Sequence, residues 1–397
     1  MSEIGRRSLL GAASAALAAG MARAETVVLP FGNGERPLVQ YPQKRPLIRL
    51  TSRPPQLETP LSAFSEGAIT PNDAFFVRYH LADVPVDRLD PSTFRLAVKG
   101  LVERPLSLTL DEIRAMPAVE LVAVNQCSGN GRGFFEPRVG GGQAGNGLMG
   151  CARWRGVPLK AVLDRAGVRA GAVEARFDGM DGPVMDTTPD FAKSLALDHA
   201  RDGEVMLAYA MNGEDLPVLN GYPLRLVVPG YYGTYWVKHL NEVTVLDQPL
   251  RNFWMATAYR VPDNDCACVP PGAAPASTRP IGRYDVRALV TNLQDGARVP
   301  AGKGVGLRGI AFDGGSGIRR VEVSTDGGAS WADASLGEDL GRYAFRPWFL
   351  PVRLERGSHA VKVRATANSG EQQPGEPRWN PAGYMRNVVE TITVEAG

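Results

Sequence analysis

Cysteine, histidine and an excess of charge of one sign are all scarce in this sequence. Its 397 residues contain only four Cys and four His, too few for a fold built on disulfides. Lys and Arg number 44 and Asp and Glu number 42, which gives a net charge of +2. That excess lies within residues 1–24, and the rest of the chain is neutral. The balance argues against a general binder of nucleic acid or of anionic membranes, although local basic pockets stay possible.

Several familiar cofactor and metal motifs are missing or incomplete. Residues 140–145 match the G-x-G-x-x-G pattern, but no helical pattern follows, so we interpret them as a loop rather than a dinucleotide site. No C-x-x-C-H haem motif occurs. Cys266 and Cys268 have no His nearby, which disfavours zinc and leaves them free or disulfide-bonded in a structural role. Cys151, among small residues, is expected to be a buried packing thiol.

The first 24 residues have the pattern of an export signal. Arg6 and Arg7 precede a small-residue apolar stretch over 9–22, which is too short to span a bilayer at ~20 residues per crossing. Ala22-Arg23-Ala24 is a suitable cleavage site. The paired arginines indicate the twin-arginine route, which exports proteins already folded around a cofactor. We therefore expect a periplasmic protein; the alternative is an amphipathic first helix.

The remaining chain can be divided into segments by their composition and by the spacing of their apolar residues. The length of the chain suits two or three domains. Residues 25–72 are rich in proline and predict an extended arm. Residues 73–275 mix predicted strands at 94–98, 121–124 and 224–229 with predicted helices at 109–116 and 159–166, which indicates an α+β catalytic domain. Residues 270–275 predict a linker. Residues 281–397 alternate apolar and polar side chains in short runs, which predicts an immunoglobulin-like β-sandwich.

Cys127 differs from the other cysteines in its context. It follows the apolar strand predicted at 121–124 and opens a segment, 129–150, in which nine of 22 residues are glycine. Such a loop lets the backbone approach a bulky ligand closely. Arg132 lies five residues further on, and a nearby cation favours the thiolate, the form that binds metal. The alternative is a buried, inert cysteine.

Four segments together resemble the sulfite oxidase family of molybdenum enzymes, and within it the periplasmic sulfite dehydrogenases of bacteria. They are Phe75-Phe76-Val77-Arg78-Tyr79-His80, Asn125-Gln126-Cys127-Ser128-Gly129-Asn130, the run 223–233 from Pro223 to Gly233, and the run 321–331 from Val321 to Trp331. The last is similar to that family's dimerisation domain. The resemblance extends from about residue 70 to the end of the chain.

The resemblance implies a molybdenum held by one pyranopterin dithiolene, or molybdopterin, and by the thiolate of Cys127. It implies that Arg78 and Arg132 bind the substrate anion, a role that suits guanidinium groups. Tyr259 would donate a hydrogen bond at the reacting centre, and Arg346 would reach toward the pocket from the second domain. The alternatives are structural ion pairs for the two arginines, a core aromatic for Tyr259 and a surface strand position for Arg346.

The resemblance also implies a set of cofactor contacts, among which Arg225 and Lys238 would meet the phosphate. Asn220 stands where animal members carry His, so that phosphate contact is weakened or rerouted. Ala144 stands where they carry Trp, so the pocket wall differs. The full set of implied cofactor contacts is Arg78, Tyr79, His80, Asp186, Asn220, Arg225, Trp236, Val237 and Lys238.

The expected activity is the oxidation of sulfite to sulfate with electrons leaving one at a time. No haem is expected in this chain, so the acceptor would be a separate c-type cytochrome. The sandwich would form a homodimer, or alternatively the chain would pair with a cytochrome subunit. The rival functions are a molybdenum-dependent methionine sulfoxide reductase, which lacks the sandwich, a nitrate reductase, and a non-catalytic binding protein.

Overall fold

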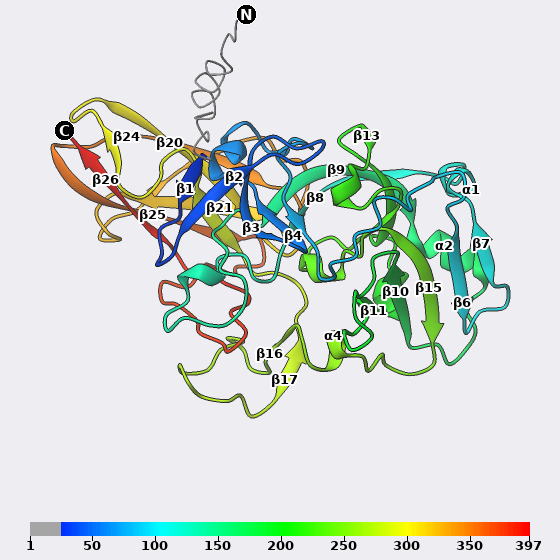
Figure 1. The fold of residues 1–397 in the computed structure, drawn as a ribbon. Helices are drawn as coiled ribbons and strands as arrows, with labels where there is room; N and C mark the ends of the chain where they lie inside the picture. The colour runs from blue at the N-terminus through cyan, green and yellow to red at the C-terminus, as the bar shows by residue number, and fades with distance from the viewer. Residues whose placement is uncertain (1–24) are drawn as a thin grey trace, which may run out of the picture.

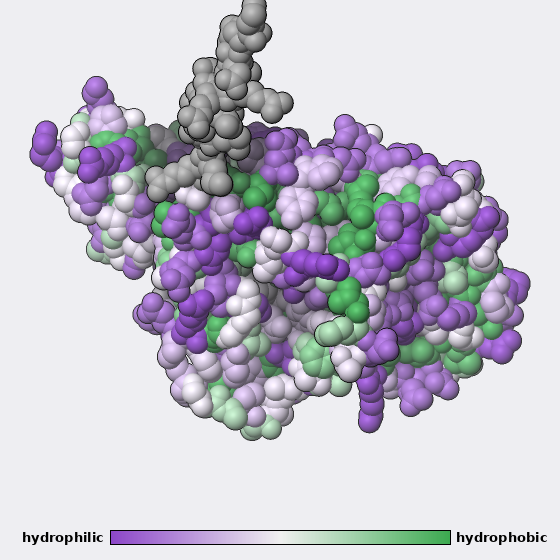
Figure 2. All heavy atoms as spheres, in the orientation of Figure 1, coloured by the Kyte–Doolittle hydropathy of each residue, from purple (hydrophilic) through white to green (hydrophobic). Residues whose placement is uncertain are grey.

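The computed structural model describes residues 25–397, and the predicted export signal lies outside this range. Figure 1 shows a β-sandwich at one end, a mixed domain at the other, and the N-terminal strands between them. Figure 2 shows hydrophilic residues over much of one face, with hydrophobic residues in groups between them. In the part of the chain that is described, no helix has the length and apolar character needed to cross a membrane.

The N-terminal segment is a sheet, not the extended arm that its composition predicts. It runs in the order β1-β2-β3-β4-β5. Its last strand belongs to the next segment of the chain, because Gln56 and Leu57 of β4 pair with Arg78 and Val77. Short strands that contain proline lack the alternation of apolar and polar residues with a period of two, so these strands could not be recognised from the sequence. The strands are β1 (Thr26–Val28), β2 (Glu35–Val39), β3 (Leu47–Ser52), β4 (Pro55–Glu58) and β5 (Val77–Arg78).

The mixed domain has two larger sheets, a separate two-stranded sheet of β16 and β17, and a few short helices, as the α+β prediction requires. One sheet has the order β11-β10-β15-β6-β7 and the other β13-β12-β9-β8, with β14 beside β12. The strands are β6 (Leu96–Gly100), β7 (Leu106–Leu108), β8 (Val119–Gln126), β9 (Met149–Pro158), β10 (Glu174–Gly179), β11 (Ala192–Ala196), β12 (Met206–Met211), β13 (Glu214–Asp215), β14 (Arg225–Val227), β15 (Leu240–Leu246), β16 (Arg260–Pro262) and β17 (Thr278–Pro280).

Both predicted helices are present, and α2 has the predicted ends, whereas α1 begins at the predicted cap but ends at Arg114, two residues before the predicted end. Thr109 and Glu112 form a capping box at the start of α1. The second helix, α2, ends at Gly167, whose φ of 72° suits glycine. The predicted linker 270–275 lies in the loop between β16 and β17, which pair with each other. The helices are α1 (Leu110–Arg114), α2 (Leu159–Ala166), α3 (Leu197–Ala200) and α4 (Phe253–Ala256).

The C-terminal part is the predicted sandwich of two sheets, ordered β18-β20-β24-β23 and β19-β26-β25-β21-β22. Val321 and Val323 face its core as expected, but Glu322 is also buried because it forms an ion pair with Arg364 at 2.9 Å. The strands are β18 (Arg287–Val290), β19 (Ala297–Val299), β20 (Gly304–Phe312), β21 (Ile318–Ser324), β22 (Ala332–Asp333), β23 (Ser335–Leu336), β24 (Arg346–Arg353), β25 (Gly357–Ala367) and β26 (Thr391–Ala396).

One hydrophobic core runs from the mixed domain into the sandwich. The amide of Val124 in β8 donates to the carbonyl of Tyr343 at 2.9 Å. Cys151 in β9 is fully buried beside it and accepts the Phe345 amide at 3.4 Å. Burial raises the pKa of the Cys151 thiol to about 12, so it is the inert packing cysteine that the sequence predicts. The two domains therefore pack against each other directly behind β8.

Candidate active site

A cavity of about 620 Å³, counting its open mouth, lies where β5, the end of β8 and the segment 219–238 meet. The structure brings ten predicted site residues to its wall, although they are spread over 182 positions of the chain. They are Arg78, Tyr79, His80, Cys127, Asn220, Arg225, Trp236, Val237, Lys238 and Tyr259.

Cys127 stands at the end of β8, where the strand passes into the glycine-rich loop. Its amide donates to the Leu148 carbonyl at 2.9 Å, and its carbonyl accepts the Asn130 amide at 3.0 Å. These bonds fix the backbone and leave a free, half-buried thiol on the cavity wall. A fixed thiol facing a cavity can serve as a soft metal ligand.

The inner wall carries buried positive charge. The Arg225 guanidinium lies over the rings of Trp154 and Trp236, and burial lowers its pKa to about 9. Burial, and then the charge of Arg225, lower the pKa of Lys238 well below its usual value. Asp181 is the acidic residue on this wall. Cations held out of water in this way favour a bound anion, because an anion restores part of the lost solvation.

Polar atoms without partners also face the cavity. Asn125 Oδ1, Ser128 Oγ and Thr234 Oγ1 are buried without a hydrogen bond, as is Nε of Arg225. A Cβ on Gly233 would lie 2.4 Å from Asn125 Oδ1, so only glycine fits there. Buried polar groups normally have partners. These atoms therefore suit a ligand that carries several hydrogen-bonding groups.

Tyr259 and His80 form a bonded pair at the cavity. The phenol oxygen lies 2.5 Å from Nε2 of His80, and Tyr259 has a φ of 56° that is uncommon for a residue with a side chain. Burial raises the pKa of Tyr259 and lowers that of His80. The pair is therefore a protonated phenol and a neutral imidazole. Tyr384 of the C-terminal domain stacks on the Tyr259 ring at 5.4 Å.

The two arginines predicted to bind the substrate occupy different positions. Arg78 is half-buried on the cavity wall, and its Nη1 donates to the carbonyl of Tyr79. Arg132 lies beside the cavity, where its guanidinium covers the Tyr384 ring at 5.0 Å and Nε donates to the Ala382 carbonyl at 3.2 Å. The guanidinium packs closely on the glycine-rich loop, since a Cβ on Gly129 would lie 2.9 Å from it.

Three predicted site residues do not line the cavity: Arg132, described above, Asp186 and Arg346. Asp186 is exposed, and Asp181, five residues earlier, is buried on the cavity wall instead. Arg346 begins β24, has a side chain that is 20% exposed and lies 3.1 Å from Asp339. The C-terminal domain brings Arg386 to the glycine-rich loop, where it packs over the Phe134 ring at 5.2 Å.

Lys44 was also missed by the sequence analysis. Its Nζ donates to Asn220 Oδ1 at 2.6 Å and to the carbonyls of Asn72 and Phe75. It brings a buried cation from the N-terminal sheet to Asn220, the position where animal members carry His. No motif marked Lys44, because it lies in the proline-rich segment.

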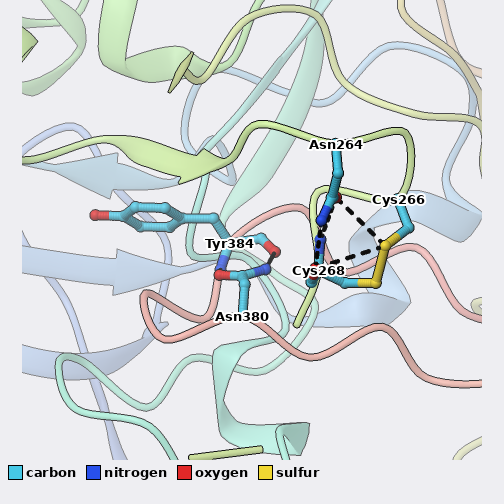
Figure 3. Close-up of a disulfide and its surroundings, with 5 residues drawn as sticks. All are labelled: Asn264, Cys266, Cys268, Asn380 and Tyr384. Carbon is cyan, nitrogen blue, oxygen red and sulfur yellow. Dashed lines mark hydrogen bonds between the residues drawn. A yellow bond between two sulfur atoms is a disulfide. The ribbon is translucent and has the colours of Figure 1, made fainter. Parts of the chain in front are cut away.

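Cys266 and Cys268 form a disulfide in the loop after β16. The side chain of Asn264 closes this loop by donating to the Cys268 carbonyl at 2.8 Å (Figure 3). The next residue, Val269, donates to the Trp379 carbonyl at 2.9 Å. Figure 3 also shows Asn380, whose amide bonds the backbone of Tyr384 at 2.8 Å. The disulfide thus has the structural role expected of it, beside the segment that carries Tyr384.

A fixed thiol, a cationic inner wall and unpartnered polar atoms define a binding domain for an anionic cofactor that bears a metal. Residues 81–254 match the oxidoreductase molybdopterin binding domain, and residues 278–396 match the Mo-co oxidoreductase dimerisation domain. The chain belongs to the sulfite oxidase family, and it is a molybdenum oxidoreductase of that type.

Similar proteins span nearly the whole chain. Mitochondrial sulfite oxidase of Mus musculus is 35% identical over 94% of this chain and 70% of its own length. Sulfite oxidase of Arabidopsis thaliana is 31% identical over 93% of this chain and 99% of its own length. The crystal structure of the sulfane dehydrogenase SoxCD from Paracoccus pantotrophus has a TM-score of 0.76 at 26% identity, covering 98% of this chain and 94% of that one.

Proposed function

We propose that this protein oxidises sulfite to sulfate and passes the two electrons, one at a time, to an external c-type cytochrome in the periplasm. The observation that carries the proposal is the free thiol of Cys127, which faces a cavity with a cationic inner wall and unpartnered polar atoms. The residues fit molybdopterin: Cys127 would be its metal ligand, and Arg225 and Lys238 would bind its phosphate. When bound, the cofactor supplies a two-electron acceptor.

The chain's own residues bind and orient the substrate. The Arg78 guanidinium on the cavity wall would hold the sulfite anion by charge-assisted hydrogen bonds. His80 fixes the phenol of Tyr259, which keeps its proton because burial raises its pKa. That hydroxyl would orient the oxygen that is transferred. Arg132 would act on the phenol indirectly. Its guanidinium covers the ring of Tyr384, and that ring stacks on the ring of Tyr259.

The test is the reduction of a c-type cytochrome by enzyme purified with its cofactor, with the molybdenum content of each sample measured. Sulfite-dependent reduction in proportion to molybdenum supports the proposal. Reduction by a sulfane sulfur donor but not by sulfite would favour the activity for which the structural neighbour is named. Reduction by neither, in molybdenum-loaded protein, would overturn the proposal.

Export is tested separately. Cell fractionation of the full chain is expected to place the mature protein in the periplasm, and Arg6→Lys with Arg7→Lys should retain it in the cytoplasm. Periplasmic protein from the double variant would argue against the twin-arginine route.

A further inference from the structure

Lys193 on β11 is a buried cation that no motif marked. Its side chain is fully buried, and Nζ donates to the carbonyl of Trp254 in α4 at 2.7 Å. The ammonium also lies 4.7 Å from the centroid of the Tyr235 ring and 5.3 Å from that of Tyr259. Within residues 25–397, no carboxylate lies within ion-pair distance of Lys193.

Burying the Lys193 ammonium in this way lowers the stability of the folded protein. Burial, and then the nearby charge of Arg260, lower the pKa of Lys193 to about 7. One carbonyl and two ring faces replace only part of the hydration that an ammonium loses. An apolar side chain of similar length would fill the same space without that cost.

The position of Lys193 relates it to Tyr259. Its bond to Trp254 holds the backbone of α4, which ends three residues before Tyr259. The Trp254 ring contacts His80 at 5.3 Å and Tyr259 at 6.1 Å between centroids. Lys193 therefore touches Tyr259 directly and also supports the ring that packs on both members of the Tyr259–His80 pair.

We propose that Lys193 is a positioning residue that holds Tyr259 in place for the reaction, and that the fold retains it at a cost in stability. The proposal rests on the proposed function, in which Tyr259 meets the substrate. Lys193 is not among the residues that line the cavity. It acts through the phenol ring and through the backbone that precedes it.

The test compares Lys193→Met with the wild type and with Ser194→Ala as a matched control. Ser194 is the next residue of β11, is equally buried and has an unpartnered hydroxyl. We expect Lys193→Met to have an unfolding temperature equal to or above that of the wild type. Its kcat per molybdenum should fall by up to about a hundredfold, as expected when a reacting geometry is displaced. The KM for sulfite should change much less.

The two measurements separate a positioning role from a structural one. A lower unfolding temperature in Lys193→Met, or an unchanged kcat in molybdenum-loaded variant, would overturn the proposal. A loss of kcat in Ser194→Ala as large as that in Lys193→Met would also overturn it, because it would reflect general disturbance of β11. The unfolding temperature does not depend on turnover. A wild type inactive on sulfite would therefore overturn the proposed function, and the stability comparison would still test Lys193.

Discussion

At the scale of single residues, the site is built from charges that the fold holds out of water. Arg225 and Lys238 share a wall on which Asp181 is the acid, and Lys44 lies behind Asn220. Burial lowers the pKa of each of these cations. Each would gain from an anion in the cavity. Arg78 lines the same cavity as His80 and Tyr259, and it is the residue that we propose binds sulfite.

Arg78→Gln is expected to raise the KM for sulfite and to lower kcat. The substrate anion would lose a charge-assisted hydrogen bond worth about 1.5–3 kcal/mol. Some of that energy should be specific to the transition state, because charge shifts as sulfur is oxidised. Steady-state kinetics of molybdenum-loaded variant and wild type would measure both constants. Unchanged KM and kcat would show that Arg78 is a structural arginine.

At the scale of elements, β4 holds the glycine-rich loop through one buried carboxyl group. Glu58 accepts the amide of Gly145 at 2.8 Å and that of Gly147 at 3.1 Å. A Cβ on Gly147 would lie 2.1 Å from the Thr59 carbonyl oxygen, so the close approach requires glycine. Burial raises the pKa of Glu58 to about 7. The N-terminal sheet therefore positions the loop that begins at Cys127.

Stability should depend on the ionisation of Glu58. Its folded pKa lies above the unfolded value of about 4.5, so its contribution is fully present below that pH and is lost as the pH rises through 7. Glu58→Gln, which stays neutral, should remove about 2–3 kcal/mol of the pH dependence between pH 5 and pH 8. Urea unfolding at both pH values measures this difference. Glu355→Gln, at an exposed site, is the control, and an equal effect there would refute the role of Glu58.

Elements with a local signal could be predicted from the sequence, whereas contacts between distant segments could not. The capping box of Thr109 marks α1, and the apolar run before Cys127 marks β8. Asp181 and Asp186 lie in one loop and differ in burial, which only the fold decides. Tyr384 reaches the site from a turn of the second domain, and no periodicity indicates such a contact.

At the scale of the whole molecule, the sandwich completes the site and is joined to it by a buried polar network. Glu390 lies 2.7 Å from Arg287 and accepts the amide of Asn146 at 2.7 Å. Asn146 belongs to the glycine-rich loop, whereas the other two residues belong to the C-terminal part. The side chain of Arg287 is 1% exposed, so its charge depends on Glu390 for compensation.

Glu390→Ala is therefore expected to destabilise the protein by about 3–5 kcal/mol, because it leaves Arg287 buried without a counter-ion. Thermal and urea unfolding measure the loss. Asp333→Ala, which removes an exposed ion pair with Arg320, is the matched control and should have little effect. If both variants lost the same small amount of unfolding free energy, the buried network would not be important for stability.

The match of residues 278–396 to a dimerisation domain predicts a homodimer. Sedimentation equilibrium at micromolar concentration should give twice the mass of the mature chain. A monomer under these conditions would contradict the prediction. A stable one-to-one complex with a cytochrome subunit would instead support the heterodimer alternative.

We infer that the thiol of Cys127 holds molybdenum in this cavity. X-ray absorption at the molybdenum edge, on wild type and on Cys127→Ser, tests it most directly, because serine replaces a soft ligand with a hard, weakly acidic one. We predict that the variant retains molybdenum through the other contacts of its cofactor, has one sulfur ligand fewer and does not oxidise sulfite. An unchanged number of sulfur ligands, or wild-type turnover by the variant, would contradict the claim.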